Sequence, residues 1–387
     1  MNFDLTPEQQ RFSDELREWV EREVPKDRMR DLERRESSYP FELWDKLAEG
    51  GYHGVSVPSA YGGQGGDNMT QMLLARGLGR SLAGLTWTWG STSFAGANSV
   101  GLYGSEEQKQ RFLPAIARGD LRFTIGFTEP GGGTDLLGGM RTHARKVEGG
   151  WLINGSKTWC TSAHVSDYIL LIARTDLEAE RPHQGVSLFL LPGKANGLSM
   201  SPIPSLGQRG LGAFNLSLED VFVADDLLLG EPNQAWYMLL PTLNYERLML
   251  LGLCCGILDG VLEEVLAYVG QREAFGQPIG QFQILQHYVA DIAMARRQTE
   301  LVAYHCAWLD MIGREAFLEL TMAKVIATEH TSRAADLGIQ ILGGNGYSAE
   351  THLQRYWRDA RLYRMSPVTN EMARNLVAER LGLPRSF

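Results

Sequence analysis

The longest apolar stretch of the chain is Leu248–Leu258, with the sequence LMLLGLCCGIL. It is apolar on every side, which predicts a helix that is buried all round. Glu246 lies just before this stretch and shares a helical face with apolar residues at i+3, i+4, i+7 and i+11, which are Met249, Leu250, Leu253 and Ile257. A carboxylate there is either paired with a cation such as Arg247 or used in chemistry, because an isolated buried charge is costly.

The first third of the chain has helical patterns. Thr6, Pro7 and Gln9 form a capping box with a proline at the first helical position, which predicts the start of a helix. Further helices are predicted at Phe41–Gly50, Met69–Arg80 and Glu106–Ile116.

From about residue 121 short runs of β-forming residues alternate with turn residues, which is typical of an antiparallel β module. Asn154-Gly155 predicts a hairpin turn, since this dipeptide readily adopts positive φ. The predicted strands are Arg122–Phe127, Trp151–Ile153, Tyr168–Ala173, Val186–Leu191 and Phe214–Leu218.

After Pro232 the patterns are helical again and predict a bundle of long antiparallel helices. These helices are expected at Ala235–Gln271, Gln281–Asp310, Arg314–Leu337 and Asn370–Leu381. The chain is therefore predicted to be an α+β protein with a helical domain over 1–120, a β domain over 121–232 and a helical bundle over 233–387.

Composition narrows the class of protein. The 387 residues carry a net charge of -9, which argues against a nucleic-acid partner. The apolar run of 11 residues is too short to span a bilayer, and the N-terminus has no signal-peptide pattern. Four cysteines, at 160, 254, 255 and 306, lack metal-ligand spacing, so we expect no metal site and a reducing, cytoplasmic location. Strands do not alternate with helices, which disfavours a Rossmann enzyme.

Four segments combine residues that suit a large anionic ligand with an aromatic ring. Phe127–Asp135 holds three consecutive glycines between two threonines, and Lys157–Ser162 places an indole beside hydroxyl groups. Arg272–Ile279 follows a predicted helix and contains an arginine and a phenylalanine. Gln340–Tyr347 follows another predicted helix and contains three glycines. Each segment alone is equally explained by a turn or by core packing.

In this order and at these separations, the segments resemble the acyl-CoA dehydrogenase family along nearly the whole chain. Other matching stretches are Leu206–Gly210, Asp220–Gly230, Glu246-Arg247 and Arg358-Asp359-Ala360. The resemblance implies an N-terminal helical domain, a central antiparallel β-barrel and a C-terminal four-helix bundle. It also implies FAD, and a homotetramer in which a neighbouring subunit completes each flavin site.

The resemblance also implies roles for individual residues. The flavin ring would meet Phe127, Thr128, Trp159 and Thr161, with Gly133 and Thr134 near the pyrophosphate. The partner subunit would supply Arg272, Phe275, Ile279, Gln283, Gln340 and Gly344, and Thr369 and Glu371 match further FAD contacts. Thr134, Asn244 and Arg247 are expected to contact substrate.

Most family members carry the catalytic glutamate on a C-terminal loop, where this chain has Pro367. A smaller subgroup, including isovaleryl-CoA dehydrogenases, carries it on the long helix in an Asp-x-Glu-Arg pattern, which Asn244-Tyr245-Glu246-Arg247 matches except at Asn244. Glu246 is therefore expected to be the base. Pro367 also lacks the backbone N–H that polarises the thioester carbonyl in the family.

The sequence thus predicts FAD-dependent α,β-dehydrogenation of an acyl thioester, carried by CoA or by a carrier protein. An electron-transfer flavoprotein is the expected acceptor. Three alternatives stay open: an enoyl-thioester reductase of the crotonobetainyl-CoA reductase type, a flavin oxidase or monooxygenase on the same fold, and an FAD-binding subunit without turnover.

Overall fold

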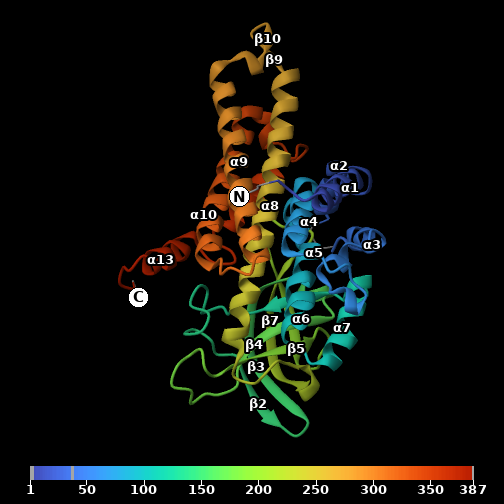
Figure 1. The fold of residues 1–387 in the computed structure, drawn as a ribbon, viewed down its shortest axis with the longest axis vertical. Coiled ribbons are helices and arrows are strands. Elements are labelled where there is room, and N and C mark those ends of the chain that lie inside the picture. The colour runs from blue at the N-terminus through green and yellow to red at the C-terminus, as the bar shows by residue number, and fades with distance from the viewer. Residues whose placement is uncertain (1–3, 36–38, 386–387) are drawn as a thin grey trace.

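The computed structural model describes residues 4–35 and 39–385. Its elements follow the predicted order of helices, strands and helices (Figure 1). One long helix, α8, runs from the sheet to the far end of the molecule, and the N-terminal helices lie against its flank (Figure 1).

The N-terminal part is helical. Thr6 caps α1 in a reciprocal capping box with Gln9, as predicted, and Ser105 caps α7 in the same way. The helices are α1 Pro7–Glu23, α2 Lys26–Glu33, α3 Phe41–Glu49, α4 Asn68–Leu82, α5 Trp87–Thr92, α6 Ser99–Tyr103 and α7 Glu106–Arg118, with a π-helical turn at Ser93–Asn98.

The central part is a sheet in the order β6-β7-β3-β2-β4-β5-β8, with β1 added beside β4. Most pairs are antiparallel, but β1 and β2 each run parallel to β4. The strands are β1 Phe123–Gly126, β2 His143–Val147, β3 Gly150–Thr161, β4 Tyr168–Arg174, β5 Val186–Pro192, β6 Leu198–Ile203, β7 Ala213–Ala224 and β8 Leu228–Leu229.

The hairpin turn predicted at Asn154-Gly155 is wrong. Strand β3 continues through this dipeptide, and β2 turns into β3 at residues 148–149 instead. Asn154 and Asp220 exchange two hydrogen bonds across β3 and β7, and the ladder shifts register between Ile153 and Gly155. A dipeptide that tolerates positive φ serves a β-bulge as well as a turn.

The C-terminal part consists of long helices. These are α8 Ala235–Gln271, α9 Gln283–Met311, α10 Phe317–Leu342, α11 Gly344–Tyr347, α12 Leu353–Tyr363 and α13 Asn370–Arg380, and a two-stranded ribbon of β9 Glu273–Ala274 and β10 Gln277–Pro278 follows α8. Helix α12 has no counterpart among the predicted elements. Within residues 4–35 and 39–385, every helix is too short or too polar to span a bilayer.

Helix α8 packs against α4 through a row of glycines. Added Cβ atoms at Gly252, Gly256 and Gly260 would lie 2.3, 2.2 and 2.8 Å from three carbonyl oxygens of α4, those of Met72, Arg76 and Arg80. Both rows repeat every four residues, so they lie along one face of each helix. The two backbones are therefore in direct contact over two helical turns.

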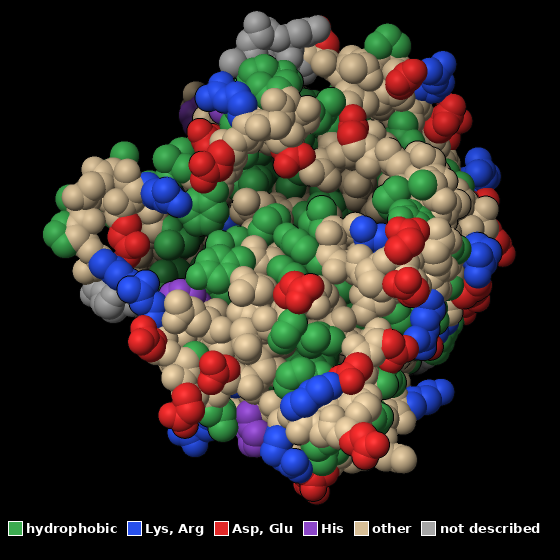
Figure 2. All heavy atoms as spheres, turned by 60° about the horizontal axis from the view of Figure 1, so that its bottom comes forward, with side chains coloured by type: hydrophobic (Ala, Val, Ile, Leu, Met, Phe, Trp, Pro, Cys, Tyr) green, Lys and Arg blue, Asp and Glu red, His purple; other side chains and the backbone are tan. Residues whose placement is uncertain are grey.

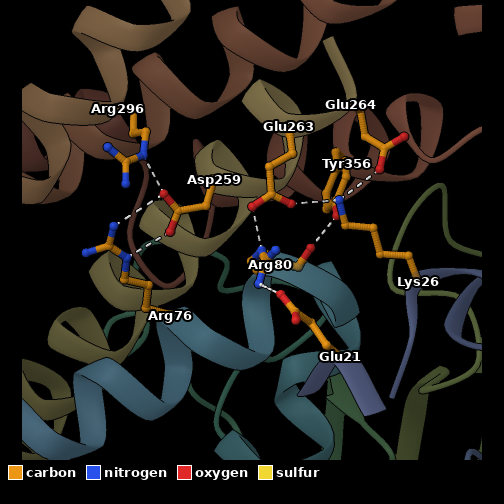
Figure 3. A network of polar contacts seen from close by, with 9 residues as sticks. All are labelled: Glu21, Lys26, Arg76, Arg80, Asp259, Glu263, Glu264, Arg296 and Tyr356. Carbon is orange, nitrogen blue, oxygen red and sulfur yellow. Dashed lines mark hydrogen bonds and ion pairs between the residues drawn. The ribbon is translucent and has the colours of Figure 1, made fainter. Parts of the chain in front are cut away.

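Ion pairs fix the register of the same two helices (Figure 3). The Arg76 Nε atom lies 2.8 Å from Asp259, and the Arg80 Nε atom lies 2.6 Å from Glu263. Arg296 of α9 and Lys26 of α2 contact the same two carboxylates at 2.5 and 3.1 Å. The arginines whose carbonyls meet the glycines thus also bind acids one turn further along α8.

We expect Gly256→Ala to destabilise the protein by about 1–3 kcal/mol, because its Cβ would overlap the Arg76 carbonyl and the helices would have to separate. Gly270→Ala is the matched control on the same helix, since no atom lies within 4 Å of its Cβ position. That change should be neutral or stabilise by up to about 1 kcal/mol. Denaturant unfolding of both variants in the same FAD-loaded state measures the difference, and equal effects would contradict direct backbone contact.

Candidate active site

A buried ion pair holds the glycine-containing loop 127–135 against β3. The Lys157 ammonium lies 2.8 Å from Glu129 and donates to the Phe127 carbonyl at 3.1 Å. Glu129 also accepts hydrogen bonds from the backbone N–H groups of Arg141 and Thr142, at 2.7 and 3.0 Å. Burial alone would raise the pKa of the Glu129 carboxyl, but Lys157 and these donors bring it below its ordinary value. The loop is therefore anchored at its base.

The end of β3 lies beside this loop. The Thr158 N–H donates to the Thr128 carbonyl at 2.8 Å, and the register shift between Lys157 and Cys160 releases Trp159 from the ladder. Trp159 has a φ of 59° and 56% of its surface is exposed. Phe127 is buried, Thr128 and Thr161 are half-buried, and Gly133 and Thr134 are exposed. All six residues expected at the flavin ring and pyrophosphate therefore lie on β3 or on the loop it holds.

Glu246 lies within α8, about three turns from its start, and not at the head of the helix. Only 8% of its surface is exposed, and its carboxylate forms no hydrogen bond or ion pair with any residue in 4–35 or 39–385. Burial raises the pKa of its carboxyl to about 7, although the Arg247 guanidinium acts in the opposite direction. The alternative was that Glu246 forms a buried salt bridge. Among the described residues no lysine, arginine or histidine lies within ion-pair distance of its carboxylate.

Arg247 is held away from Glu246 by other contacts. Its Nη1 atom donates to the Asn244 side chain at 3.1 Å, and its guanidinium carbon lies 5.2 Å from the centre of the Phe317 ring on α10. Asn244 thus contacts Arg247, in the position where an acidic residue was expected.

A short series of contacts joins Glu246 to the loop at 127. Tyr245, the neighbour of Glu246, hydrogen-bonds to Ser93 at 2.5 Å. The next residue, Phe94, packs edge-on against Phe127 with 6.4 Å between ring centres. The turn of α8 that carries Glu246 and the loop at 127 are therefore joined through the π-helical turn at Ser93–Asn98. Figure 2 views this end of the molecule and shows hydrophobic side chains gathered in a hollow.

The segment that contains Pro367 connects α12 to α13. Thr369 caps α13, its hydroxyl accepting from the Met372 N–H at 3.1 Å, and Glu371 is exposed in the first turn of that helix. The neighbouring Val368 carbonyl accepts a hydrogen bond from Lys324 of α10. The segment is thereby attached to the bundle.

The remaining predicted FAD residues lie at the opposite end of α8 (Figure 1). Arg272, Ile279 and Gly344 line one groove of about 380 Å³, together with Tyr268 and Asn345. Phe275, Gln283 and Gln340 are exposed outside its lining. Arg272 is 26 residues beyond Glu246, which is roughly 40 Å along a helix. The two groups of residues are not brought together within one chain.

Comparison with known proteins matches all three parts of the chain. The N-terminal, middle and C-terminal domains of acyl-CoA dehydrogenase match residues 6–120, 124–221 and 233–382. The chain is 33% identical to the probable acyl-CoA dehydrogenase YngJ of Bacillus subtilis, over 98% of this chain and 100% of that protein. The chain belongs to the acyl-CoA dehydrogenase family.

Other relatives differ in the reaction that they are named for. Isovaleryl-CoA dehydrogenase of Arabidopsis thaliana is 31% identical over 89% of this chain and 84% of its own, and the caffeyl-CoA reductase-Etf complex subunit CarC of Acetobacterium woodii is 31% identical over 94% and 95%. The solved structure of PigA with FAD and proline superposes with a TM-score of 0.93 at 25% identity, over 99% of this chain and 100% of that one.

The acyl-CoA dehydrogenase identity confirms the predicted α+β fold, and the protein is a FAD-dependent oxidoreductase that acts on acyl-CoA. The surface around β3 fits a flavin: an exposed indole stands beside a loop in which no atom lies within 4 Å of the Cβ positions of Gly131 and Gly133. Phe275 is 95% exposed near the groove at Arg272, where its ring packs edge-on against Phe282. The limits of the three domains, as predicted to the residue, stay a prediction.

Sequence patterns did not single out the anchors of the site. Glu129 and Lys157 were within quoted segments, but nothing in the pattern showed that they pair across 28 residues. Lys324 lies inside the predicted helix Arg314–Leu337, where no motif marked it. The available signal was a charged residue within an apolar or β-forming run, as for Glu246.

We expect Lys157→Met to destabilise the protein by about 3–5 kcal/mol, because it leaves the Glu129 carboxylate buried without its cation. FAD affinity should fall with it, since the Phe127–Asp135 loop loses its anchor. Lys146→Met on β2 is the control: its ion pair with Asp225 is about half exposed and should contribute less than about 1 kcal/mol. Thermal unfolding of the apoprotein and FAD titration measure both effects; equal losses in the two variants would contradict this role.

The raised pKa of Glu246 also predicts how stability depends on pH. The folded carboxyl has a pKa of about 7 against an ordinary value of 4.5, so the stability present at pH 4.5 is lost as the pH rises through 7. Glu246→Gln removes this loss and should be more stable than the unaltered protein by about 3 kcal/mol at pH 8. Denaturant unfolding from pH 5 to pH 8 tests this; parallel stability curves would show that Glu246 is not held in a poorly solvated site.

Proposed function

We propose that the protein removes a proton and a hydride from the α- and β-carbons of an acyl thioester, with Glu246 as the base. The observation that supports this best is the buried Glu246 carboxylate, which has no hydrogen-bond or ion-pair partner in the described part of the chain and a pKa of about 7. Bound FAD supplies the hydride acceptor. The α-proton goes to Glu246, the hydride leaves the β-carbon, and the product is the α,β-unsaturated thioester.

A base of this kind suits the reaction. A carboxylate with a pKa near neutrality is a stronger base than an exposed one and is still ionised in part at pH 7. Arg247 is bound to Asn244 and Phe317, so it does not neutralise Glu246 through a direct ion pair. Thr134, Asn244 and Arg247 are proposed to contact the substrate, and the hydrophobic hollow at this end of the molecule suits an acyl chain (Figure 2).

We infer that a second copy of the chain completes each flavin site. Residues for the flavin ring and residues for the adenosine end lie at opposite ends of α8, which supports a shared site and the proposed homotetramer. Phe127, Thr128, Gly133, Thr134, Trp159 and Thr161 would come from one chain, with Thr369 and Glu371 beside them. The partner would contribute Arg272, Phe275, Ile279, Gln283, Gln340 and Gly344.

The name of the Acetobacterium relative supports two further proposals. An electron-transfer flavoprotein is the proposed electron acceptor, because that relative is named as a subunit of a reductase–Etf complex. The same name favours a second candidate function, reduction of an enoyl thioester through the same site in the opposite direction. In that direction Glu246 would give its proton to the α-carbon.

We also propose a cytoplasmic location, in keeping with four free cysteines.

Anaerobic mixing of the FAD-loaded protein with acyl-CoAs of varied length and branching tests the proposal. At least one should bleach the flavin, and the rate should rise with pH to a plateau above about 7, as Glu246 ionises. Glu246→Gln should retain FAD and lose about 10²–10⁴-fold in rate.

Glu264→Gln is the matched control, because this carboxylate also lies on α8 but pairs with Lys26 at 2.8 Å. The flavin of the Glu264→Gln protein should be reduced by acyl-CoA at the normal rate. Undiminished flavin reduction in Glu246→Gln would exclude Glu246 as the base. If only enoyl-CoA reoxidises the reduced protein at a useful rate, the reductase direction is favoured.

A further inference from the structure

Lys324 is a fully buried lysine outside the residues discussed as base or cofactor ligands. Its Nζ atom lies 2.5 Å from the Val368 carbonyl and 2.7 Å from the Asn370 side chain, and the residue has 0% of its surface exposed. The Thr328 hydroxyl donates to the same Asn370 oxygen at 3.1 Å. A buried ammonium needs such acceptors. Val368 lies in the segment that joins α12 to α13, and Asn370 is the first residue of α13.

Lys324 lies beside the part of α8 that carries Glu246. Phe317, Lys324 and Thr331 are spaced by seven residues, or two turns, and so share one face of α10. Helix α10 packs along α8, and the Phe317 ring lies 5.2 Å from the guanidinium carbon of Arg247. Burial lowers the pKa of Lys324 to about 8, and the Arg247 guanidinium acts in the same direction, so the two cations are near each other. The segment that Lys324 binds is therefore held beside the part of α8 that carries Arg247 and Glu246.

This segment offers backbone donors that the protein leaves free. Pro367 has no N–H, and the N–H groups of Met365, Ser366 and Asn370 donate to carbonyls of Leu362 and Arg364. Within residues 4–35 and 39–385 no acceptor is found for the N–H groups of Val368 and Thr369. Both residues are half-buried. Lys324 holds the carbonyl of the peptide between them, so the N–H of that trans peptide points away from α10.

We propose that Lys324 is a positioning residue, which fixes the Val368–Thr369 segment so that its free N–H groups bind the thioester carbonyl while Glu246 removes the α-proton. The inference rests on the proposed function. As the proton leaves, negative charge develops on the carbonyl oxygen, and donors that are already in place stabilise it. The proposed donors, the N–H groups of Val368 and Thr369, directly follow Pro367 in the chain. The hydrogen bond from Lys324 to the Val368 carbonyl holds them in one orientation.

A purely structural lysine would behave differently. It would change folding and FAD retention, but not the polarisation of a bound substrate. The stretching frequency of the thioester carbonyl separates the two roles, because a hydrogen bond to the oxygen lowers it. Glu246→Gln provides the background, since substrate can bind to it without being consumed.

We suggest recording isotope-edited infrared spectra of a ¹³C-carbonyl acyl-CoA bound to Glu246→Gln, to Glu246→Gln with Lys324→Met, and to Glu246→Gln with Thr328→Val. The carbonyl frequency should fall on binding to the first and third proteins and return toward the free value in the second. In the otherwise unaltered enzyme, Lys324→Met should lower kcat by about 10²-fold, with KM changed less than threefold.

Thr328→Val is the matched control, because Thr328 binds Asn370 without touching Val368. An unchanged carbonyl frequency in the Lys324→Met protein would overturn the proposal. So would the absence of any shift in Glu246→Gln alone, a measurement that does not depend on whether Lys324→Met folds. Failure of the proposed base is a separate result, seen as normal flavin reduction by Glu246→Gln.

Discussion

The close contact of α4 with α8 determines much of this structure. Glycines at 252, 256 and 260 let the α4 carbonyls lie directly on α8, and ion pairs of Arg76 and Arg80 fix the register. A helix covered in this way is buried along its middle and carries its side chains in a poorly solvated interior. Glu246 lies six residues before Gly252 on this helix, and burial raises the pKa of its carboxyl to about 7.

Two buried lysines each hold an irregular segment that the proposed function uses. Lys157 binds the Phe127 carbonyl and Glu129, and so supports the loop next to the flavin surface. Lys324 binds the Val368 carbonyl and Asn370, and so supports the segment after Pro367. In both cases an ammonium on a regular element binds a backbone carbonyl of an irregular one. A buried ammonium without acceptors is costly, which ties each loop to one position.

Helix α8 also connects the proposed base to the surface proposed for assembly. With 37 residues it reaches from the base to the groove at Arg272, much further than one active site. At its far end Phe275 is 95% exposed, and its ring contact with Phe282, edge-on at 6.1 Å between ring centres, leaves most of the ring uncovered. The length of one helix therefore gives a physical reason for the proposed sharing of a flavin between subunits.

The sequence alone determined the element order, the capped start of α1, the limits of α8 and the membership of the family, because these depend on local periodicity and on motifs. It also led to the proposal of Glu246 as the base. It failed at Asn154-Gly155, where the same backbone preference serves a bulge, and it overlooked α12. The tertiary structure alone decided that Glu246 lacks an ion-pair partner and that Lys157 and Lys324 hold loops. It also showed that the flavin residues divide between two ends of one helix. These features depend on distances between residues far apart in the chain, which no local pattern contains.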